Sequence, residues 1–208
     1  MKTRTFLFYL LAILLGGCLP VISLHPLYSE KNVVFDEKLL GTWVDDPNKP
    51  ETTWQFSRGY AADAPETKKQ YKLIYRDKDG KKGSFEAHLV KLNKQLFLDV
   101  YPSELPWEPN DPNKVQWAYN TLFLIPAHGF LKVNAAEPQL KLQIVLSDKC
   151  KEFLEKDPNA VERTIVEDRV VLTAQTKKLQ EFFGKYGDAE IYGDELVLTR
   201  QPAHKTQK

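Results

Sequence analysis

The sequence predicts a mainly β protein, an antiparallel β-barrel with two short peripheral α-helices, placed after a cleaved N-terminal signal peptide. Most segments after residue 33 alternate apolar and polar residues with a period of two, which is typical of half-buried strands. The breaks between these segments are short and hold turn residues, so consecutive strands can pair only in antiparallel fashion. Roughly eight to ten short strands joined in this way fit a barrel or a sandwich. A closed barrel has no unpaired strand edge, which favours the barrel.

The first 18 residues form a segment of their own. Lys2 and Arg4 give a positively charged start, an apolar run follows from Phe6 to Leu15, and Leu15-Gly16-Gly17-Cys18 ends the segment. The run is too short to span a bilayer as a helix, which needs ~20 residues, but it has the length of a signal-peptide core. Leu15, Gly16, Gly17 and Cys18 together resemble the lipobox of bacterial lipoproteins.

The lipobox resemblance implies a lipid anchor at Cys18. In that family the chain is cleaved before the cysteine, which carries a diacylglycerol and usually a further acyl chain such as palmitate. Two or three acyl chains hold a protein on a membrane far more firmly than one. Leu19, in place of an inner-membrane retention Asp, favours the periplasmic face of the outer membrane. The alternatives are an ordinary secretory signal with a chance cysteine, or a short uncleaved anchor.

The chain therefore divides into four parts. We expect a lipoprotein signal peptide over residues 1–17, a lipid-anchored tether over 18–32, a barrel domain over 33–201 and a disordered tail over 202–208. Residues 20–32 mix Pro, Ser, His and charged residues without a period, which suits a flexible tether. Loss of Lys2 and Arg4 with the signal peptide leaves 27 basic and 28 acidic residues. This balance argues against nucleic acid as a partner.

The expected elements follow in order. Asp36 is placed to cap a helical turn over residues 37–40, which Gly41 closes. Asp79-Gly80 and Asn93-Lys94 are placed as hairpin turns. Four prolines exclude a central strand from residues 102–114. We expect strands over residues 43–45, 52–57, 71–76, 84–92, 95–101, 115–125, 130–133, 140–146, 169–172 and 195–200, while residues 162–167 are ambiguous.

Two short helices complete the expected elements. The first places Cys150 on one face with Phe153 and Leu154. Because lipid would occupy Cys18, Cys150 has no disulfide partner, and we interpret it as a buried structural thiol and not as a reactive one. The second helix runs to Tyr186, capped by Thr173 or Thr176 and stopped by Gly187.

Gly41-Thr42-Trp43 opens the first barrel strand directly after the helical turn. This arrangement resembles the Gly-x-Trp element of lipocalin-like proteins. The resemblance implies a lipocalin-like or calycin-like barrel, in which Trp43 packs across one end and Arg200 of the last strand lies over its indole ring. The chain departs from an ordinary lipocalin because it has no Thr-Asp-Tyr-like turn and its helix layout fits only in part. The alternative for Trp43 is a core aromatic residue at a strand start.

No catalytic constellation is visible, so we expect no enzyme, cofactor or metal site. His25, His88, His128 and His204 are scattered without metal-ligand spacing. We expect His88 to be exposed on its strand and His128 to lie in a turn. The acidic and amide residues within 108–113 lack the glycine and terminal glutamate of a calcium loop. No nucleophile elbow or phosphate-binding glycine loop is present.

Aromatic residues carry the remaining functional signal. In a small barrel they either fill the interior or line a cavity for an apolar ligand. Trp54, Tyr71 and Tyr75 are candidate ligand contacts, and Trp107 on the proline-rich loop is a candidate lid or partner contact. We therefore expect a non-enzymatic envelope lipoprotein whose barrel binds a small apolar molecule or lipid. The alternative is a structural or interaction lipoprotein with a filled core that binds an envelope protein.

Overall fold

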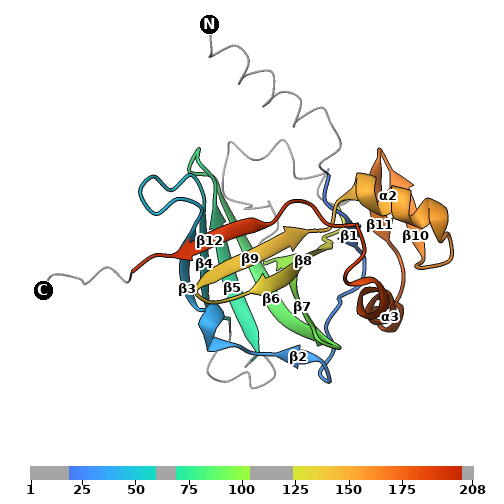
Figure 1. Ribbon diagram of the computed structural model, residues 1–208, viewed down its shortest axis with the longest axis horizontal. Coiled ribbons are helices and arrows are strands. Elements are labelled where there is room, and N and C mark those ends of the chain that lie inside the picture. The colour runs from blue at the N-terminus through green and yellow to red at the C-terminus, as the bar shows by residue number, and fades with distance from the viewer. Residues whose placement is uncertain (1–18, 60–68, 104–123, 203–208) are drawn as a thin grey trace, which may run out of the picture.

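The protein is built on a closed antiparallel β-barrel of eight strands (Figure 1). The computed structural model describes residues 19–59, 69–103 and 124–202. Leu15, Gly16, Gly17, Cys18 and Trp107 lie outside the described residues. The barrel strands are β3 (Gly41–Val44), β4 (Thr53–Arg58), β5 (Gln70–Arg76), β6 (Lys82–Leu92), β7 (Gln95–Pro102), β8 (His128–Ala135), β9 (Gln139–Ile144) and β12 (Leu196–Arg200). The predicted fold class, a mainly β antiparallel barrel with two helices, is confirmed.

Two strand pairings close the barrel. The strands from β3 to β9 pair in chain order, each antiparallel to the next. β12 then fits between β9 and β3, with Leu196 opposite Leu142 and Arg200 opposite Trp43. Because the strands alternate in direction, β4, β6, β8 and β12 all begin at one end of the barrel. We call this end the mouth.

Local sequence explains the turns. Asp36 accepts a hydrogen bond from the Lys38 N–H at 2.9 Å and so caps the 3-10 helix η1 (Glu37–Leu39). Gly80 and Asn93 have positive φ angles of 79° and 55°, which the tight β5–β6 and β6–β7 turns require. The predicted cap and both predicted hairpins are therefore confirmed.

The inward-pointing side chains of the strands fill the end of the barrel opposite the mouth. Trp43, Phe56 and Tyr71 point inward there and are almost completely buried. Leucines from the barrel strands and from η1 complete this core, because every second residue of a strand faces the interior. The buried leucines of this core are Leu39, Leu73, Leu89, Leu98, Leu131, Leu140, Leu142 and Leu198.

A second layer covers the outside of the barrel wall. It holds α2 (Ser147–Lys156), α3 (Thr176–Tyr186) and a hairpin of β10 (Arg163–Val166) and β11 (Arg169–Leu172), drawn at the right in Figure 1. Phe183 of α3 packs on Phe97 of β7 and Phe130 of β8, with ring centroids 5.5 and 5.4 Å apart. The wall from β6 to β8 is therefore buried on both faces.

Residues 19–32 belong to this second layer, which corrects the prediction of a flexible tether. β1 (Ile22–Ser23) pairs antiparallel with β8 and parallel with β11. Val21 and Leu27 are almost completely buried in the outer core, and β2 (Val33–Val34) then pairs with β6. Without a sequence period, these contacts could not be predicted, because the paired residues lie between 55 and 149 positions apart in the chain.

Three expected elements need smaller corrections. Leu124 and Ile125 have no regular secondary structure, and the rest of the strand expected over residues 115–125 lies outside the described residues. The ambiguous residues 162–167 contain β10. α3 begins after Gln175 without a side-chain cap, so neither Thr173 nor Thr176 caps it. None of the described helices is long and apolar enough to cross a membrane.

Candidate functional site

An apolar pocket lies at the mouth of the barrel. Its volume is about 450 Å³. Trp54, Tyr75 and Phe85 line it from one side of the barrel, and Leu131 and Ile144 line it from the other. The remaining lining residues are Pro20, Val21, Ile22, Leu73, Val100, Gly129 and Phe130. The barrel is therefore filled at one end and hollow at the other.

The pocket brings together two of the three predicted ligand contacts. Trp54 and Tyr75 pair across β4 and β5, with ring centroids 5.0 Å apart in an edge-on arrangement. Burial raises the pKa of Tyr75, which keeps its hydroxyl neutral. The buried indole N–H of Trp54 has no hydrogen-bond partner among the described residues, which leaves one unsatisfied donor in a largely apolar wall.

Tyr71 does not reach the pocket. Its ring is fully buried in the filled half of the barrel, where it stacks on Phe35 at 4.5 Å. Its hydroxyl donates to the Asp36 carbonyl oxygen at 3.1 Å and accepts from the Asp36 N–H at 2.6 Å. Burial raises the pKa of Tyr71 to about 12. Tyr71 therefore holds η1 on the barrel, which corrects its assignment as a ligand contact.

Gly41, Trp43 and Arg200 meet at the closed end of the barrel. The Arg200 guanidinium lies 4.2 Å from the Trp43 ring centroid, as the resemblance to lipocalin-like proteins predicts. It also donates hydrogen bonds to the carbonyl oxygens of Lys38 and Leu40. Gly41 has a φ of 121°, and a Cβ at this position would lie 2.7 Å from Arg200 Nη1. The missing side chain leaves room for the guanidinium.

A buried polar pair lies on the outer wall, and sequence reasoning missed it. Asp99 Oδ1 is 2.7 Å from His128 Nδ1, and Asp99 Oδ2 accepts the Leu27 N–H at 2.6 Å. Both side chains are almost completely buried, so the expectation that His128 lies in a turn is wrong. The sequence signal for this buried pair is the charged residue Asp99, which lies between the apolar residues Leu98 and Val100 of a strand. The pair fastens the N-terminal segment to the barrel.

His88 lies beside this pair and is half-buried, not exposed as expected. Its imidazole stacks on Tyr28 with ring centroids 3.8 Å apart. Burial lowers the pKa of His88, and the neighbouring Asp99 carboxylate offsets part of this effect. His88 therefore contributes to packing of the N-terminal segment in its neutral form.

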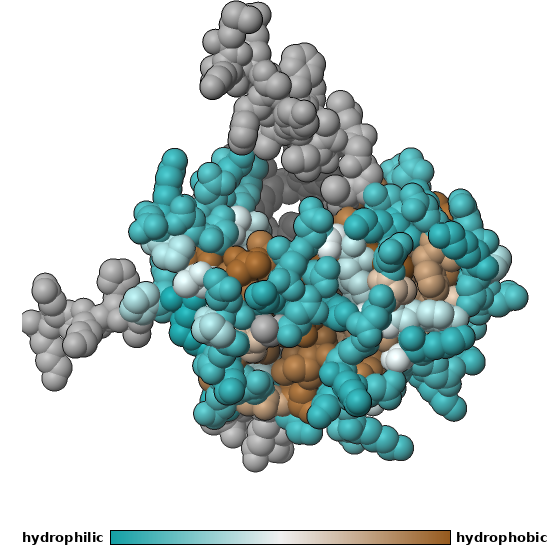
Figure 2. Space-filling view, viewed as in Figure 1, coloured by the Kyte–Doolittle hydropathy of each residue, from teal (hydrophilic) through white to brown (hydrophobic). Residues whose placement is uncertain are grey.

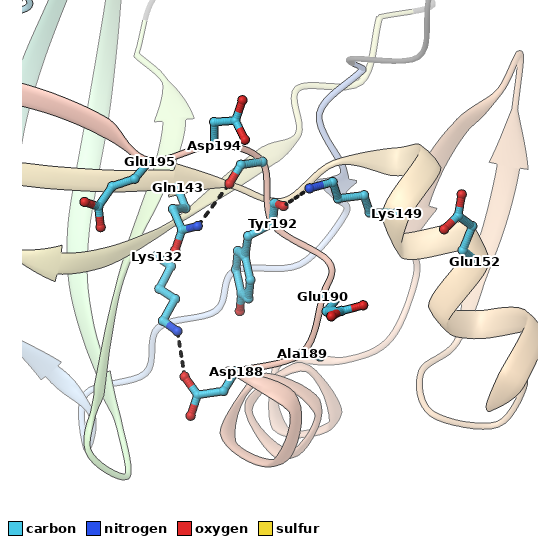
Figure 3. A pocket seen from close by; sticks show the side chains of 11 residues that line it. Lys132, Gln143, Lys149, Glu152, Asp188, Ala189, Glu190, Tyr192, Asp194 and Glu195 are labelled. Carbon is cyan, nitrogen blue, oxygen red and sulfur yellow. Dashed lines mark hydrogen bonds and ion pairs between the residues drawn. The ribbon is translucent and has the colours of Figure 1, made fainter.

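A polar hollow of about 550 Å³ lies between the barrel and the second layer (Figure 3). Its two lysines are already engaged within its wall. Lys132 Nζ lies 2.7 Å from the Asp188 carboxylate, and Lys149 Nζ donates to the Tyr192 carbonyl oxygen at 2.7 Å. The hydrogen bond from Lys132 lowers the pKa of Asp188. Because Lys132 is paired with a carboxylate and Lys149 is bonded to a backbone carbonyl oxygen, the described residues of the hollow present no set of free cations that converges on a ligand.

The described residues show no other reactive arrangement. No group of three or more His, Cys, Asp or Glu residues within 19–59, 69–103 and 124–202 could hold a metal ion. Cys150 is fully buried, and burial raises the pKa of its thiol to about 12. This environment fits the predicted structural thiol, because the reactive form is the thiolate.

The fold and the pocket define a class of protein, a closed antiparallel barrel with an apolar hollow at one mouth, compatible with ligand binding. Comparison of the chain with protein-family models, curated proteins and solved structures finds no match. The functional argument therefore rests on the pocket and its surroundings.

Proposed function

We propose that the protein is a lipid-anchored lipoprotein of the bacterial cell envelope whose barrel binds a small apolar molecule or lipid without catalysing a reaction. The pocket at the mouth carries this proposal. Ligand pockets in proteins have volumes of about 300–1,000 Å³ and mostly apolar walls, and this pocket meets both criteria with about 450 Å³. The proposed anchor is Cys18, on the periplasmic face of the outer membrane.

The chemistry of the wall supports an acyl chain or a similar apolar group as the ligand. Each methylene group of a ligand that leaves water contributes about 0.8 kcal/mol to binding. The aromatic and aliphatic side chains of the wall provide the apolar surroundings that this requires. Among the buried side-chain atoms of the described residues that line the pocket, the indole N–H of Trp54 is the one donor without a partner.

A binding assay with a matched pair of variants tests the pocket. Ile144 lines the pocket with 39% of its surface exposed, whereas Val197 has 36% exposed and lies outside the pocket on β12. The chain from residue 18, with Cys18→Ser, is titrated with the apolar dye N-phenyl-1-naphthylamine. We expect Ile144→Glu to weaken dye binding about tenfold or more, because it places a carboxylate in the apolar wall. Val197→Glu leaves the affinity unchanged.

Two results would contradict ligand binding. One is equal dye affinity of the Ile144→Glu and Val197→Glu variants. The other is native mass spectrometry of the detergent-free protein in which no lipid co-purifies or rebinds. Together they favour the alternative, an envelope lipoprotein that binds a protein partner, which the filled half of the barrel would also suit.

The anchor has its own test. Cells that express the full chain are labelled with radioactive palmitate and fractionated, with Cys18→Ser as the control. We expect label in the unaltered chain and none in the variant. Label that persists in the Cys18→Ser chain overturns the anchoring proposal.

A further inference from the structure

Exposed large apolar side chains gather around β1. On the side of the molecule shown in Figure 2, hydrophilic side chains surround the hydrophobic patches. Among the residues that the structure describes, seven large apolar side chains are exposed: Leu24, Leu124, Ile125, Ile144, Ile165, Val166 and Val197. All except Val197 lie near β1: next to β1 or β8, at the end of β9, which pairs with β8, or on β10, which pairs with β11. Such a concentration differs from the single exposed apolar residues of ordinary surfaces.

Strand pairing brings these segments together. Ile22 and Ser23 of β1 pair with Gly129 and His128 at the start of β8. Leu24 directly follows β1, and Leu124 and Ile125 lead into β8, so these three apolar residues flank the same pairing. The exposed fraction of Ile125 is 76%, the largest of the group.

The β10–β11 hairpin lies at the other edge of β1. β1 runs parallel to β11, with Ile22 opposite Val171. Because the two strands run parallel, the turn that begins β11 lies beside the start of β1. Ile165 and Val166 precede this turn on β10, and each has 54% of its surface exposed. Successive strand residues point to opposite sides of a sheet, and the register puts Val166 on the same side as Ile22, whereas Ile165 lies on the side of the buried Val170. We call the exposed group Leu24, Leu124, Ile125, Ile144 and Val166 the β1 face.

The pocket opens beside the β1 face. Ile144 belongs to both, and Pro20, Val21 and Ile22 line the pocket on the side of β1. The pocket mouth and the exposed apolar residues therefore share one region of the surface.

The start of the described chain lies in the same region. The Leu19 carbonyl oxygen accepts the Ser147 N–H at 2.8 Å, and Pro20 forms a β-bridge with Leu146. Cys18 is two residues before Pro20, and two residues span at most about 7 Å. A lipid on Cys18 would thus be attached next to the pocket, with no free tether between lipid and barrel.

We propose that the β1 face docks on the surface of the lipid bilayer and that the barrel mouth opens onto it. The proposal rests on the proposed function, since Cys18 supplies the anchor. The apolar side chains of the face lie at the boundary of headgroups and acyl chains, about 5–10 Å deep, as apolar faces of peripheral proteins do. An acyl chain of the bilayer then reaches the pocket without crossing water.

Fluorescence quenching from within the bilayer tests this orientation. The chain from Cys18 onward contains every described residue, and Cys150 is buried, so Cys18 alone couples to a maleimide-bearing phosphatidylethanolamine in phosphatidylcholine vesicles. An environment-sensitive fluorescent amino acid replaces Ile125, Val166 or, as a control, Lys94. Lys94 is exposed in the β6–β7 turn at the closed end of the barrel.

The expected result is a loss of emission at positions 125 and 166, with a blue shift, when the vesicles contain brominated phosphatidylcholine. The reporter at position 94 keeps its emission. Equal quenching at all three positions, or none at 125 and 166, overturns the proposal.

A pair of charged variants provides a second measurement. With the reporter at position 125, Val166→Asp reduces the quenching, whereas Val197→Asp does not. Unchanged quenching in the Val166→Asp variant contradicts docking through this face. Dye binding to the pocket and palmitate labelling of Cys18 do not depend on Val166. Failure of docking is therefore distinguishable from failure of the proposed function.

Discussion

At the scale of single residues, Arg200 joins the two ends of the chain's barrel segment. Its guanidinium covers the Trp43 ring and donates to two carbonyl oxygens of the η1 turn, 160 and 162 positions earlier in the chain. The contact closes the filled end of the barrel and satisfies carbonyl groups that the short helix leaves free.

Replacement of Arg200 by alanine should destabilise the protein by about 2 kcal/mol. The stacking contact contributes roughly 0.5–2 kcal/mol, and the hydrogen bonds to the carbonyl oxygens add to it, discounted for partial exposure. Urea unfolding followed by tryptophan fluorescence measures the change. Arg76→Ala, which removes an exposed arginine at the end of β5, serves as the control. An unchanged midpoint for Arg200→Ala would remove the stabilising role of the contact.

His88 should make stability depend on pH. Its folded-state pKa is lowered by burial, whereas the unfolded chain has the usual value of about 6.5. Below about pH 6.5 the unfolded state therefore binds more protons, and the free energy of unfolding falls as the pH drops toward the lowered pKa of the folded state.

Comparison with a variant isolates this contribution. His88→Phe keeps a ring against Tyr28 but does not titrate, so its free energy of unfolding should fall less than that of the unaltered chain between pH 7 and 5. Urea unfolding at several pH values measures both slopes. Parallel slopes would show that His88 does not titrate differently in the folded and unfolded states.

At the scale of elements, the segment before the barrel is part of the fold. The buried Asp99 accepts the Leu27 N–H 72 positions away in the chain, and Gln180 of α3 donates to the Leu27 carbonyl oxygen at 2.9 Å. A mobile tether would make neither contact. The segment instead fills the space between the barrel wall and α3.

Two leucines of this segment provide a direct comparison. Leu27 is fully buried, whereas Leu24 has 41% of its surface exposed. We expect Leu27→Ala to reduce the free energy of unfolding by about 2–5 kcal/mol, as truncation of a buried leucine does, and Leu24→Ala to have little effect. Chemical denaturation of both variants is the measurement. Equal, small effects of the two substitutions would mean that the segment contributes no more to the stability of the fold than a flexible tether would.

At the scale of the whole molecule, the barrel wall joins two cores. Strands β6 to β8 point leucines into the barrel and Val90, Phe97 and Phe130 into the second layer. Both cores share these strands. If one core lost its packing, one face of the strands that form the other core would become exposed. The molecule should therefore unfold as one cooperative unit.

Truncation of Phe183 tests this cooperativity. Phe183→Ala opens a cavity between α3 and the barrel and should destabilise the protein by about 3–5 kcal/mol. Tryptophan fluorescence includes Trp43 and Trp54 of the barrel, and circular dichroism at 222 nm includes the helices, so the two signals should shift together in urea. Separate transitions would show that the second layer unfolds independently of the barrel.

Local patterns in the sequence were sufficient to predict the β class, most strands, both hairpin turns and the Asp36 cap, and the resemblance of Gly41-Thr42-Trp43 to the Gly-x-Trp element implied the contact of Arg200 with Trp43. Each of these depends on backbone preferences or side-chain alternation within a few residues, or on one short motif. Periodicity also separates inward from outward residues, so the aromatic side chains could be placed in the interior of the barrel.

Only the tertiary structure decided which part of the barrel is hollow and what surrounds its mouth. Sequence alternation puts Tyr71, Trp54 and Tyr75 on inward faces alike, but the depth of each along the barrel depends on register and closure. The incorporation of residues 19–32 and the Asp99–His128 pair were likewise invisible, because their partners are distant in sequence. Contacts of this kind follow from the assembled barrel, and they place Pro20, two residues after the proposed anchor, in the wall of the pocket.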